Sequence, residues 1–448
     1  MPYPVDIPPP TSKGFSIGLN GTRGRYTFQH GSDFYAFLCQ DDTSVAGTLK
    51  VQAMKSTNLG LTWAAMDSSN APAVDTHTGI ADSYTVSVDS DTAWVLSVRL
   101  SVATPIGIKV TAFDLSTDLW AVPSNYSSPV PDFINNGTSQ TVLSLCVVGA
   151  NDYQLMYSGP RENVSGVDCG RVYIAAFDGT TFGTSVELPD QAGNLISYGG
   201  MSCIAENSRC HFFYISTESG TIGAPLYHVG LDTDGTTFGT TAKVTDDLYW
   251  GFSHSSTLVG QTSEAIIANI AAADRLAIAA EINDNSGSTS QSLRVFYSAL
   301  GLNPTWSNTI ASQGVDGGPE LPRPDNALVI PAFMTLGYAN GNLILIWTWQ
   351  ANSFTTPGDF NYTKSLSGSF SWSAYATLFQ PSIADNTPTQ MTSFDGTAGV
   401  GIVGLSLNTS ADSEFLAQFY FVPFGRTVGN FWSVPNAMLC GHGGNCWT

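Results

Sequence analysis

One pattern recurs along the whole chain of 448 residues, and it restricts the possible folds more than any other feature of the sequence. A tight polar turn between two apolar segments returns every 56 to 67 residues, and an aromatic residue follows each turn after 31 to 37 residues. The turns begin at His30, Asp89, Gly149, Glu206, Ala272, Ala339 and Asp395, and the aromatic residues are Trp63, Trp120, Phe182, Phe238, Trp306, Trp372 and Trp432. This constant phase, at a period of about 61 residues, indicates one repeated structural unit.

Each unit has the pattern of short β-strands. In the second unit, residues 83–89 alternate apolar and polar side chains, residues 92–100 form a nearly continuous apolar run, and residues 108–114 alternate again. A fourth short segment follows the aromatic residue. Four antiparallel strands in each of seven units predict an all-β fold, a seven-bladed β-propeller of four-stranded blades. A tandem of two-sheet sandwiches would have similar strands, but it gives no reason for a constant period.

One segment conflicts locally with this prediction. Residues 265–282 are rich in alanine, and helix propensity alone favours an α-helix there. The repeat instead places a turn at Asp274 and Arg275, in the middle of the segment. We therefore expect two strands joined by a turn.

The repeats predict three regions: an N-terminal arm (1–24), the propeller (25–438) and a C-terminal tail (439–448). The proline-rich start of the arm is typical of extended, polyproline-like chain and cannot supply a central strand. The arm is either a terminus draped over the ring or a tether to another chain. In the tail, Cys440 and Cys446 form a local disulfide or remain two free thiols. With His442 they supply only three metal ligands, so no metal site is expected.

The charge balance excludes some partners. The chain has 16 Lys and Arg against 36 Asp and Glu, which gives a net charge of −20, and charged residues make up only 12% of it. Clustered cations are missing, and this argues against nucleic-acid binding. The longest apolar runs, such as residues 343–349, are too short to span a membrane, and the first residues do not resemble a secretory signal.

The first aromatic residue ends the segment STNLGLTW, from Ser56 to Trp63. This segment resembles the Asp-box or BNR repeat of sialidase-type propellers, with Asn58 in the place of the aspartate. Looser echoes occur at residues 178–182, 232–238 and 365–372. The resemblance implies a turn between the third and fourth strands of a blade. Sialidases also have six blades and a cluster of three arginines, which this sequence does not match, so no catalytic residue is carried over.

Long connections are expected between the second and third strands of each unit and between successive units, and topology places both sets on one face of the ring. Aromatic and cationic side chains in these connections are the candidates for ligand contact. They are Tyr126, Arg161, Tyr249, Trp250, His254, Arg323 and Phe354.

His30, His211 and His228 fall in or beside strands and are interpreted as structural, whereas His77 and His254 lie in long connections. Residues 232–235 and 281–287 resemble calcium loops superficially, but we interpret both as ordinary turns, because the later ligands of such a loop are missing. No metal and no cofactor is expected.

Three classes of function remain open. The composition, low in lysine and rich in Ser, Thr, Gly and Asn, favours a non-enzymatic, exposed propeller, such as a phage decoration or receptor-binding protein in a virion. Its partner would be another virion or surface protein bound through the N-terminal arm, and its location the virion or the extracellular space. The alternatives are a secreted lectin that binds glycans and a sialidase-like glycoside hydrolase, because a fold alone does not decide function.

Overall fold

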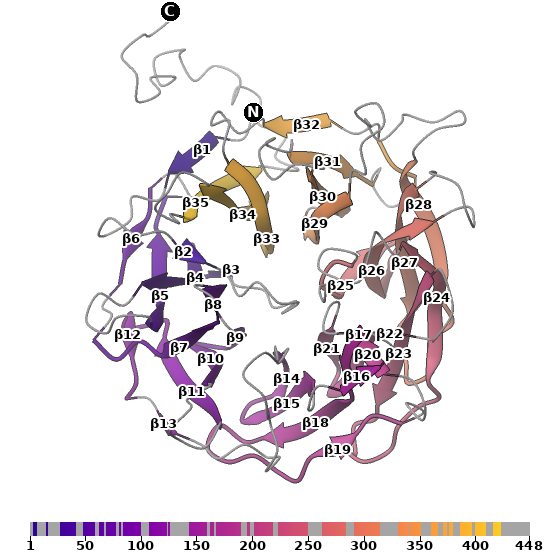
Figure 1. Cartoon of the computed structure of the whole chain (residues 1–448), viewed down its shortest axis with the longest axis horizontal. Helices are drawn as coiled ribbons and strands as arrows, with labels where there is room; N and C mark the ends of the chain where they lie inside the picture. Colours follow the sequence, from indigo (N-terminus) through magenta and orange to yellow (C-terminus); the bar gives the residue numbers. More distant parts are fainter. Residues whose placement is uncertain are drawn as a thin grey trace, which may run out of the picture.

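The computed structural model shows a ring of β-sheets, with the first strand of each unit on the inside of the ring (Figure 1). It describes residues 3–6, 15–16, 27–41, 48–58, 62–66, 69–77, 80–81, 84–99, 107–122, 124–125, 143–158, 162–164, 167–189, 195–197, 201–217, 223–249, 262–283, 291–313, 330–339, 341–350, 360–365, 371–373, 376–379, 386–396, 399–408 and 415–422. Among these residues every regular element is a β-strand. No helix in this part of the chain could cross a membrane.

The strands form six hydrogen-bonded sheets, numbered here in chain order. The first sheet contains β2 (Phe15–Ser16), β3 (Thr27–His30), β4 (Asp33–Asp41), β5 (Thr48–Ser56), β6 (Ala64–Ala65), β7 (Ala73–His77) and β8 (Ile80–Ala81). The second contains β9 (Tyr84–Asp89), β10 (Thr92–Arg99), β11 (Gly107–Asp114), β12 (Leu119–Trp120) and β13 (Ser124–Asn125). The third contains β14 (Leu143–Gly149), β15 (Asp152–Ser158), β18 (Val172–Phe177) and β19 (Val186–Glu187).

The fourth sheet is the largest, with 11 strands. They are β16 (Glu162–Val164), β17 (Val167–Gly170), β20 (Leu195–Ser197), β21 (Ser202–Glu206), β22 (Arg209–Thr217), β23 (Gly223–Leu231), β24 (Ala242–Tyr249), β25 (Ile266–Ile270), β26 (Ala273–Asn283), β27 (Gln291–Ala299) and β28 (Ser307–Gln313). The fifth contains β29 (Ile330–Ala339), β30 (Asn342–Gln350), β31 (Phe360–Lys364) and β32 (Ala376–Phe379). The sixth contains β33 (Asn386–Gly396), β34 (Gly399–Asn408), β35 (Phe415–Val422) and β1 (Tyr3–Asp6).

The all-β propeller of four-stranded antiparallel blades is confirmed, but the predicted number of blades is wrong. Six sheets form the ring, not seven. The fourth and fifth sequence units belong to one sheet, because Leu248 of β24 pairs with Ile282 of β26. The sequence period counts repeated units, whereas a hydrogen bond between two units merges them into one sheet.

The predicted turn in the alanine-rich segment is confirmed as a turn, but it lies three residues earlier than expected. β25 and β26 form a hairpin in which Ile270 pairs with Ala273. Ala271 and Ala272 make the turn, with φ angles of 54° and 60°. Strand pairing along β26 and β27 overrides the helix propensity of the alanines, since propensity is the weaker effect.

The N-terminal arm contributes a strand to the ring. Tyr3 to Asp6 pair antiparallel with Phe421 to Gln418 of β35, at the outer edge of the sixth sheet. An edge position tolerates Pro4, which has no N–H to donate, as expected for a proline-rich strand. The tail from residue 439 lies outside the described residues, and the three predicted region boundaries remain predictions.

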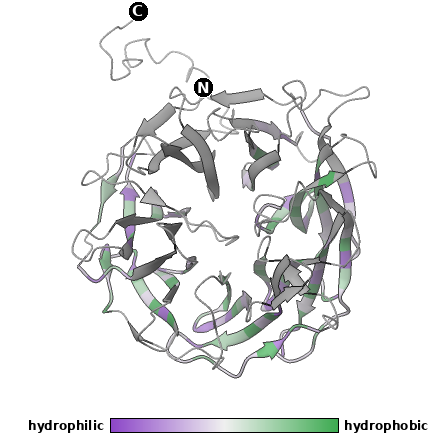
Figure 2. Ribbon diagram, viewed as in Figure 1, coloured by the Kyte–Doolittle hydropathy of each residue, from purple (hydrophilic) through white to green (hydrophobic). Residues whose placement is uncertain are grey.

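Apolar side chains fill the junctions between neighbouring units. Phe37 of β4 contacts both Phe113 of β11 and Trp120 of β12, with ring centroids 5.6 and 6.0 Å apart. Strands in the middle of the units are buried on both faces, because consecutive residues, Phe34–Phe37 of β4 and Leu343–Trp347 of β30, are all inaccessible to solvent. Hydrophobic parts of the described strands are green in Figure 2. The aromatic content of the sequence is therefore used where one unit packs on the next.

The ring has two unlike faces. Tight turns join first to second and third to fourth strands at one face, the tight-turn face, and the other connections meet at the opposite, long-connection face. Short extra strands gather at the long-connection face. β2 pairs with the end of β4, β7 with the start of β5, β13 with the start of β11, and β20 with the end of β22.

Candidate functional site

Most of the residues predicted to contact a ligand fall outside the part of the chain that the structure describes. These are Tyr126, Arg161, Trp250, His254, Arg323 and Phe354. Tyr249 is the last residue of β24, and its backbone pairs with Gly223 at the long-connection face. The structure thus neither brings the seven residues together nor separates them, and their role remains a prediction.

The framework beside several of these residues is described. Tyr126 directly follows β13 in the sequence, Arg161 directly precedes β16, and Trp250 directly follows β24. β16 and β17 form a hairpin that pairs through β20 with the end of β22. The second and fourth sheets therefore carry extra strands at the long-connection face, β13 on the second and β16, β17 and β20 on the fourth, and this rim of extra strands is the candidate binding surface.

The segment from Ser56 to Trp63 connects β5 to β6, the third and fourth strands of the first unit, which is where the resemblance implied a turn. Asn58 Oδ1 accepts hydrogen bonds from the backbone N–H of Thr62, at 2.9 Å, and from the hydroxyl of Ser56, at 3.0 Å. The Trp63 side chain is buried in the core between the first two sheets. Asn58 thus stabilises its own turn and Trp63 packs in the core, and the Asp-box resemblance itself remains an interpretation.

The turn predicted at residues 232–235 is confirmed, with a hydrogen bond from the Gly235 N–H to the Asp232 carbonyl. Asp234 Oδ1 accepts hydrogen bonds from the backbone N–H groups of Thr236 and Thr237. Bonds from the Thr237 hydroxyl and these amides lower the pKa of Asp234 to about 2. The Asp234 carboxylate thus accepts hydrogen bonds from groups of its own turn. In the described residues no group of three or more His, Cys, Asp or Glu is arranged to hold a metal ion.

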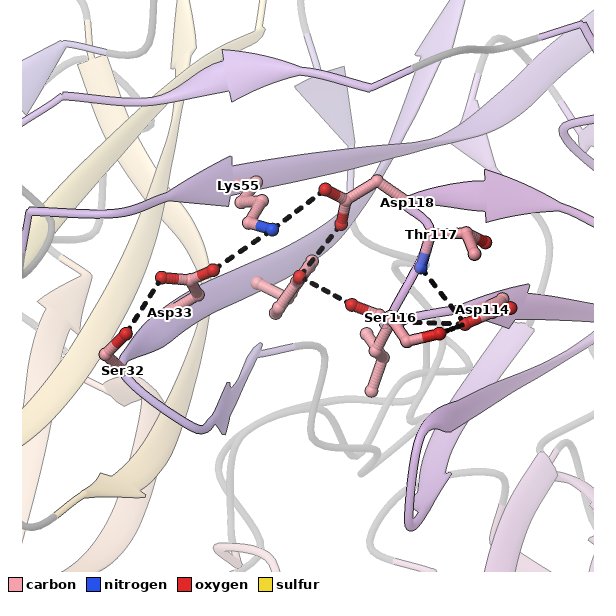
Figure 3. A network of polar contacts seen from close by, with 9 residues as sticks. Ser32, Asp33, Lys55, Asp114, Ser116, Thr117 and Asp118 are labelled. Carbon is pink, nitrogen blue, oxygen red and sulfur yellow. Dashed lines mark hydrogen bonds and ion pairs between the residues drawn. The ribbon is translucent and has the colours of Figure 1, made fainter.

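A charged network joins the first two sheets at the tight-turn face (Figure 3). Lys55 Nζ lies 3.0 Å from Asp33 Oδ2 and 2.8 Å from Asp118 Oδ2. Tyr35 Oη lies 2.8 Å from Asp118 Oδ1 and 3.0 Å from the carbonyl oxygen of Leu115. The lysine also lies over the Tyr35 ring, 5.1 Å from its centroid. These contacts connect β4 and β5 to the turn between β11 and β12.

The protonation states of this network are fixed by its geometry. Burial raises the pKa of Tyr35 most, Lys55 opposes this shift and Asp118 adds to it, and together they place the pKa at about 12. Burial alone would lower the pKa of Lys55, but hydrogen bonds to Asp118, Tyr35 and Asp33 raise it above its ordinary value. At physiological pH the lysine is charged and the tyrosine neutral. Lys55 therefore forms ion pairs that join the two sheets, and neither residue is in the protonation state of a general base.

Two histidines are buried together in the fourth sheet. His211 of β22 and His228 of β23 are inaccessible to solvent, and His211 Nδ1 lies 3.0 Å from His228 Nε2. Their rings stack with centroids 5.2 Å apart, and Trp306 packs against His228 from the next unit at 5.4 Å. The structural role predicted for both residues is confirmed.

Three charged residues, Glu206, Arg209 and Asp232, lie on the His211 side of the histidine pair. His211 Nε2 lies 3.5 Å from Glu206 Oε2, and Arg209 contacts both Glu206, at 3.5 Å, and Asp232, at 3.0 Å. Burial lowers the pKa of His211 to about 4, although Glu206 opposes that shift, and burial places the pKa of His228 well below its ordinary value. Both rings are therefore neutral at pH 7.

Polar side chains on the innermost strands link successive units. Glu264 is buried, and its Oε2 accepts a hydrogen bond from the Thr335 hydroxyl at 3.0 Å. The same kind of contact is made further along the ring: Ser87 Oγ donates to the Leu145 carbonyl, Cys203 N–H donates to Ser144 Oγ, and Ala265 N–H donates to Ser202 Oγ. Sequence reasoning missed these contacts, because a serine or threonine within a strand has no spacing signal of its own.

The described carboxylates do not suggest a hydrolase site at the long-connection face. Glu206 and Asp232 converge on one arginine, but they lie beside the β21–β22 turn and just after β23, at the tight-turn face. Glycoside hydrolysis needs an acid and a second carboxylate on opposite sides of a bound sugar. Within the described residues, Glu206 and Asp232 instead form ion pairs with Arg209.

No family model matches the sequence, and no curated protein matches it. Solved structures do share its fold. An ulvan lyase of polysaccharide lyase family PL25, bound to a GlcA(1-4)Rha3S repeat, superposes with a TM-score of 0.50 at 9% identity, over 94% of this chain and 96% of that one. An α-L-arabinofuranosidase from Fusarium graminearum gives 0.42 at 11% identity, over 94% and 97%. A phage phi92 endosialidase gives 0.43 at 10% identity, over 96% and 70%. At these identities the likeness establishes a β-propeller and no more.

Proposed function

We propose that the protein is a non-enzymatic, exposed β-propeller that binds carbohydrate at its long-connection face. The observation that carries this proposal is the rim of extra strands on the second and fourth sheets, next to Tyr126, Arg161, Tyr249 and Trp250 in the sequence. Aromatic faces suit sugar rings, and a rigid framework lowers the entropy lost on binding.

Charge selects the kind of carbohydrate. The ulvan lyase with the same fold binds an acidic saccharide, so carbohydrate is the first ligand class to test. This chain carries a net charge of −20, which repels a polyanion. The proposed ligand is therefore a neutral glycan.

A glycan array with the full chain tests this proposal, and binding to neutral glycans is the expected result. Trp250→Ala should weaken that binding by about tenfold or more. Leu119→Ala is the matched control, because Leu119 is a 52% exposed apolar residue at the tight-turn face. Equal binding by all three proteins, or binding of acidic glycans alone, would overturn the proposal.

We further propose that the protein is a component of a particle, as a phage decoration or receptor-binding protein is, and that the N-terminal arm holds it to another virion or surface protein. The lysine-poor composition supports this proposal. Since Tyr3–Asp6 pairs with β35 and Phe15–Ser16 pairs with β4, the tether would be the rest of the arm, residues 7–14 and 17–24. Replacing residues 7–14 and 17–24 with Gly/Ser segments of equal length, with Phe15 and Ser16 kept, should abolish co-sedimentation with particles while the circular dichroism spectrum stays unchanged; retained co-sedimentation would refute the tether.

A further inference from the structure

Three cysteines meet where the third sheet packs on the fourth. Cys146 comes from β14, Cys203 from β21 and Cys210 from β22. The sulfur atoms of Cys146 and Cys210 lie 3.5 Å apart, and both side chains are buried. Cys203 is half-buried, and its thiol donates to Ser144 Oγ at 3.2 Å. All three are free thiols in the structure.

The surroundings of the buried pair are apolar. Cys146 and Cys210 belong to one core cluster with Met156, Phe212 and Val229, among other residues of the two sheets. Burial raises the pKa of the Cys146 thiol well above its ordinary value, and the neighbouring thiols raise it further. A protonated thiol is a poor nucleophile and a poor metal ligand, so neither catalysis nor metal binding accounts for the pair.

We propose that Cys146 and Cys210 are the site of a disulfide that links the third sheet to the fourth. The two sulfur atoms need to approach by roughly 1.5 Å to reach bonding distance. Both S–H bonds break, one S–S bond forms, and two protons and two electrons reduce a small disulfide such as oxidised glutathione to two thiols. The reaction takes place as the chain folds, before burial protects the thiols. Cys203 remains a thiol.

The bond would act on stability. Its ends are 64 residues apart in the sequence, so it restricts a long loop of the unfolded chain. It would also hold two sheets together that are otherwise joined across this junction by side-chain packing and single hydrogen bonds such as that from Cys203 N–H to Ser144 Oγ. We expect an oxidised protein to unfold several degrees above the reduced one.

Peptide mapping tests the pairing directly. The full chain is expressed once in an oxidising compartment and once in a reducing one, alkylated under denaturing conditions and digested without reduction. The oxidised sample should yield a peptide cross-linked between Cys146 and Cys210, with Cys203 alkylated. Alkylation of all three residues, or a cross-link from Cys146 to Cys203, would overturn the proposal.

Variants separate this bond from any that the other cysteines form. Addition of dithiothreitol should lower the melting temperature of the oxidised wild type and of Cys203→Ala by the same several degrees. Dithiothreitol should not cause this fall in melting temperature in Cys210→Ala or in Cys146→Ala, because neither variant can form the bond. Both substitutions replace a thiol with a small apolar group that the core accepts. An undiminished shift in these two variants would show that the stabilising bond lies elsewhere.

Discussion

The buried histidine pair should make the stability of the protein depend on pH between about 6.5 and 4. The pKa of His211 is about 4 in the folded protein and 6.5 in the unfolded chain. Below pH 6.5 the unfolded chain binds a proton that the folded protein does not, so the free energy of unfolding falls as the pH falls. A difference of about 2.5 pKa units corresponds to about 3 kcal/mol, reached near pH 4. His228, with its pKa lowered in the same direction, adds to this loss.

The charged groups around the pair set this direction. Glu206 on β21 favours the protonated imidazole, whereas Arg209 on β22 opposes it, and Asp232 after β23 pairs with the arginine. Burial outweighs the carboxylate, so the net pKa shift is downward.

Urea unfolding at intervals from pH 7 to pH 4 measures this dependence. The double variant His211→Gln, His228→Gln is the control, because it removes both titrating groups and keeps polar side chains of similar size. Its stability should be nearly constant over the same range. The turn aspartates do not interfere, since their lowered pKa values, about 2 for Asp114 and Asp234, place their effect below pH 4. A wild-type stability that is flat between pH 6.5 and 4.5, or an equal slope in the double variant, would refute the reasoning.

Two further predictions concern the folded ring. Replacing Ala271 and Ala272 with Asn and Gly should raise the free energy of unfolding by about 1 to 2 kcal/mol, because both alanines have left-handed φ angles that Asn and Gly adopt at lower cost; a urea titration that shows no gain would contradict this. Lys55→Met should lower the free energy of unfolding by about 2 kcal/mol, because Asp33 and Asp118 then lose the cation between them in a half-buried site. A loss of less than about 0.5 kcal/mol would mean that solvent screens this network as it does an exposed ion pair.

Much of the fold could be predicted because the turns recur in phase with the aromatic residues. The β9–β10 hairpin begins and ends within a residue or two of the prediction, since alternation and a polar turn are local signals. The merging of two units into the fourth sheet could not be predicted, because it depends on one long-range pair, Leu248 with Ile282. The position of the turn at Ala271 was also missed, since alanine carries no turn signal.

The site was less accessible to prediction. His211 and His228 were assigned a structural role, but their contact follows only from the register of β22 and β23, in which His211 pairs with Gly230 and Phe213 with His228. The two histidines are diagonal neighbours in that register, and a correct hairpin alignment would have revealed the pair. The contact residues proposed in the long connections remain a prediction.

The pairing of β1 with β35 also has a consequence for how the ring is made in time. Tyr3 is synthesised 418 residues before its partner Phe421. At about 5 to 20 residues per second, the first strand waits for its partner for roughly 20 to 80 seconds. Sheets between them can form during synthesis, but the circle cannot close until translation has reached β35. Until then the nascent chain is an open arc in which β1 has no strand partner, and closure of the ring waits for the synthesis of β35.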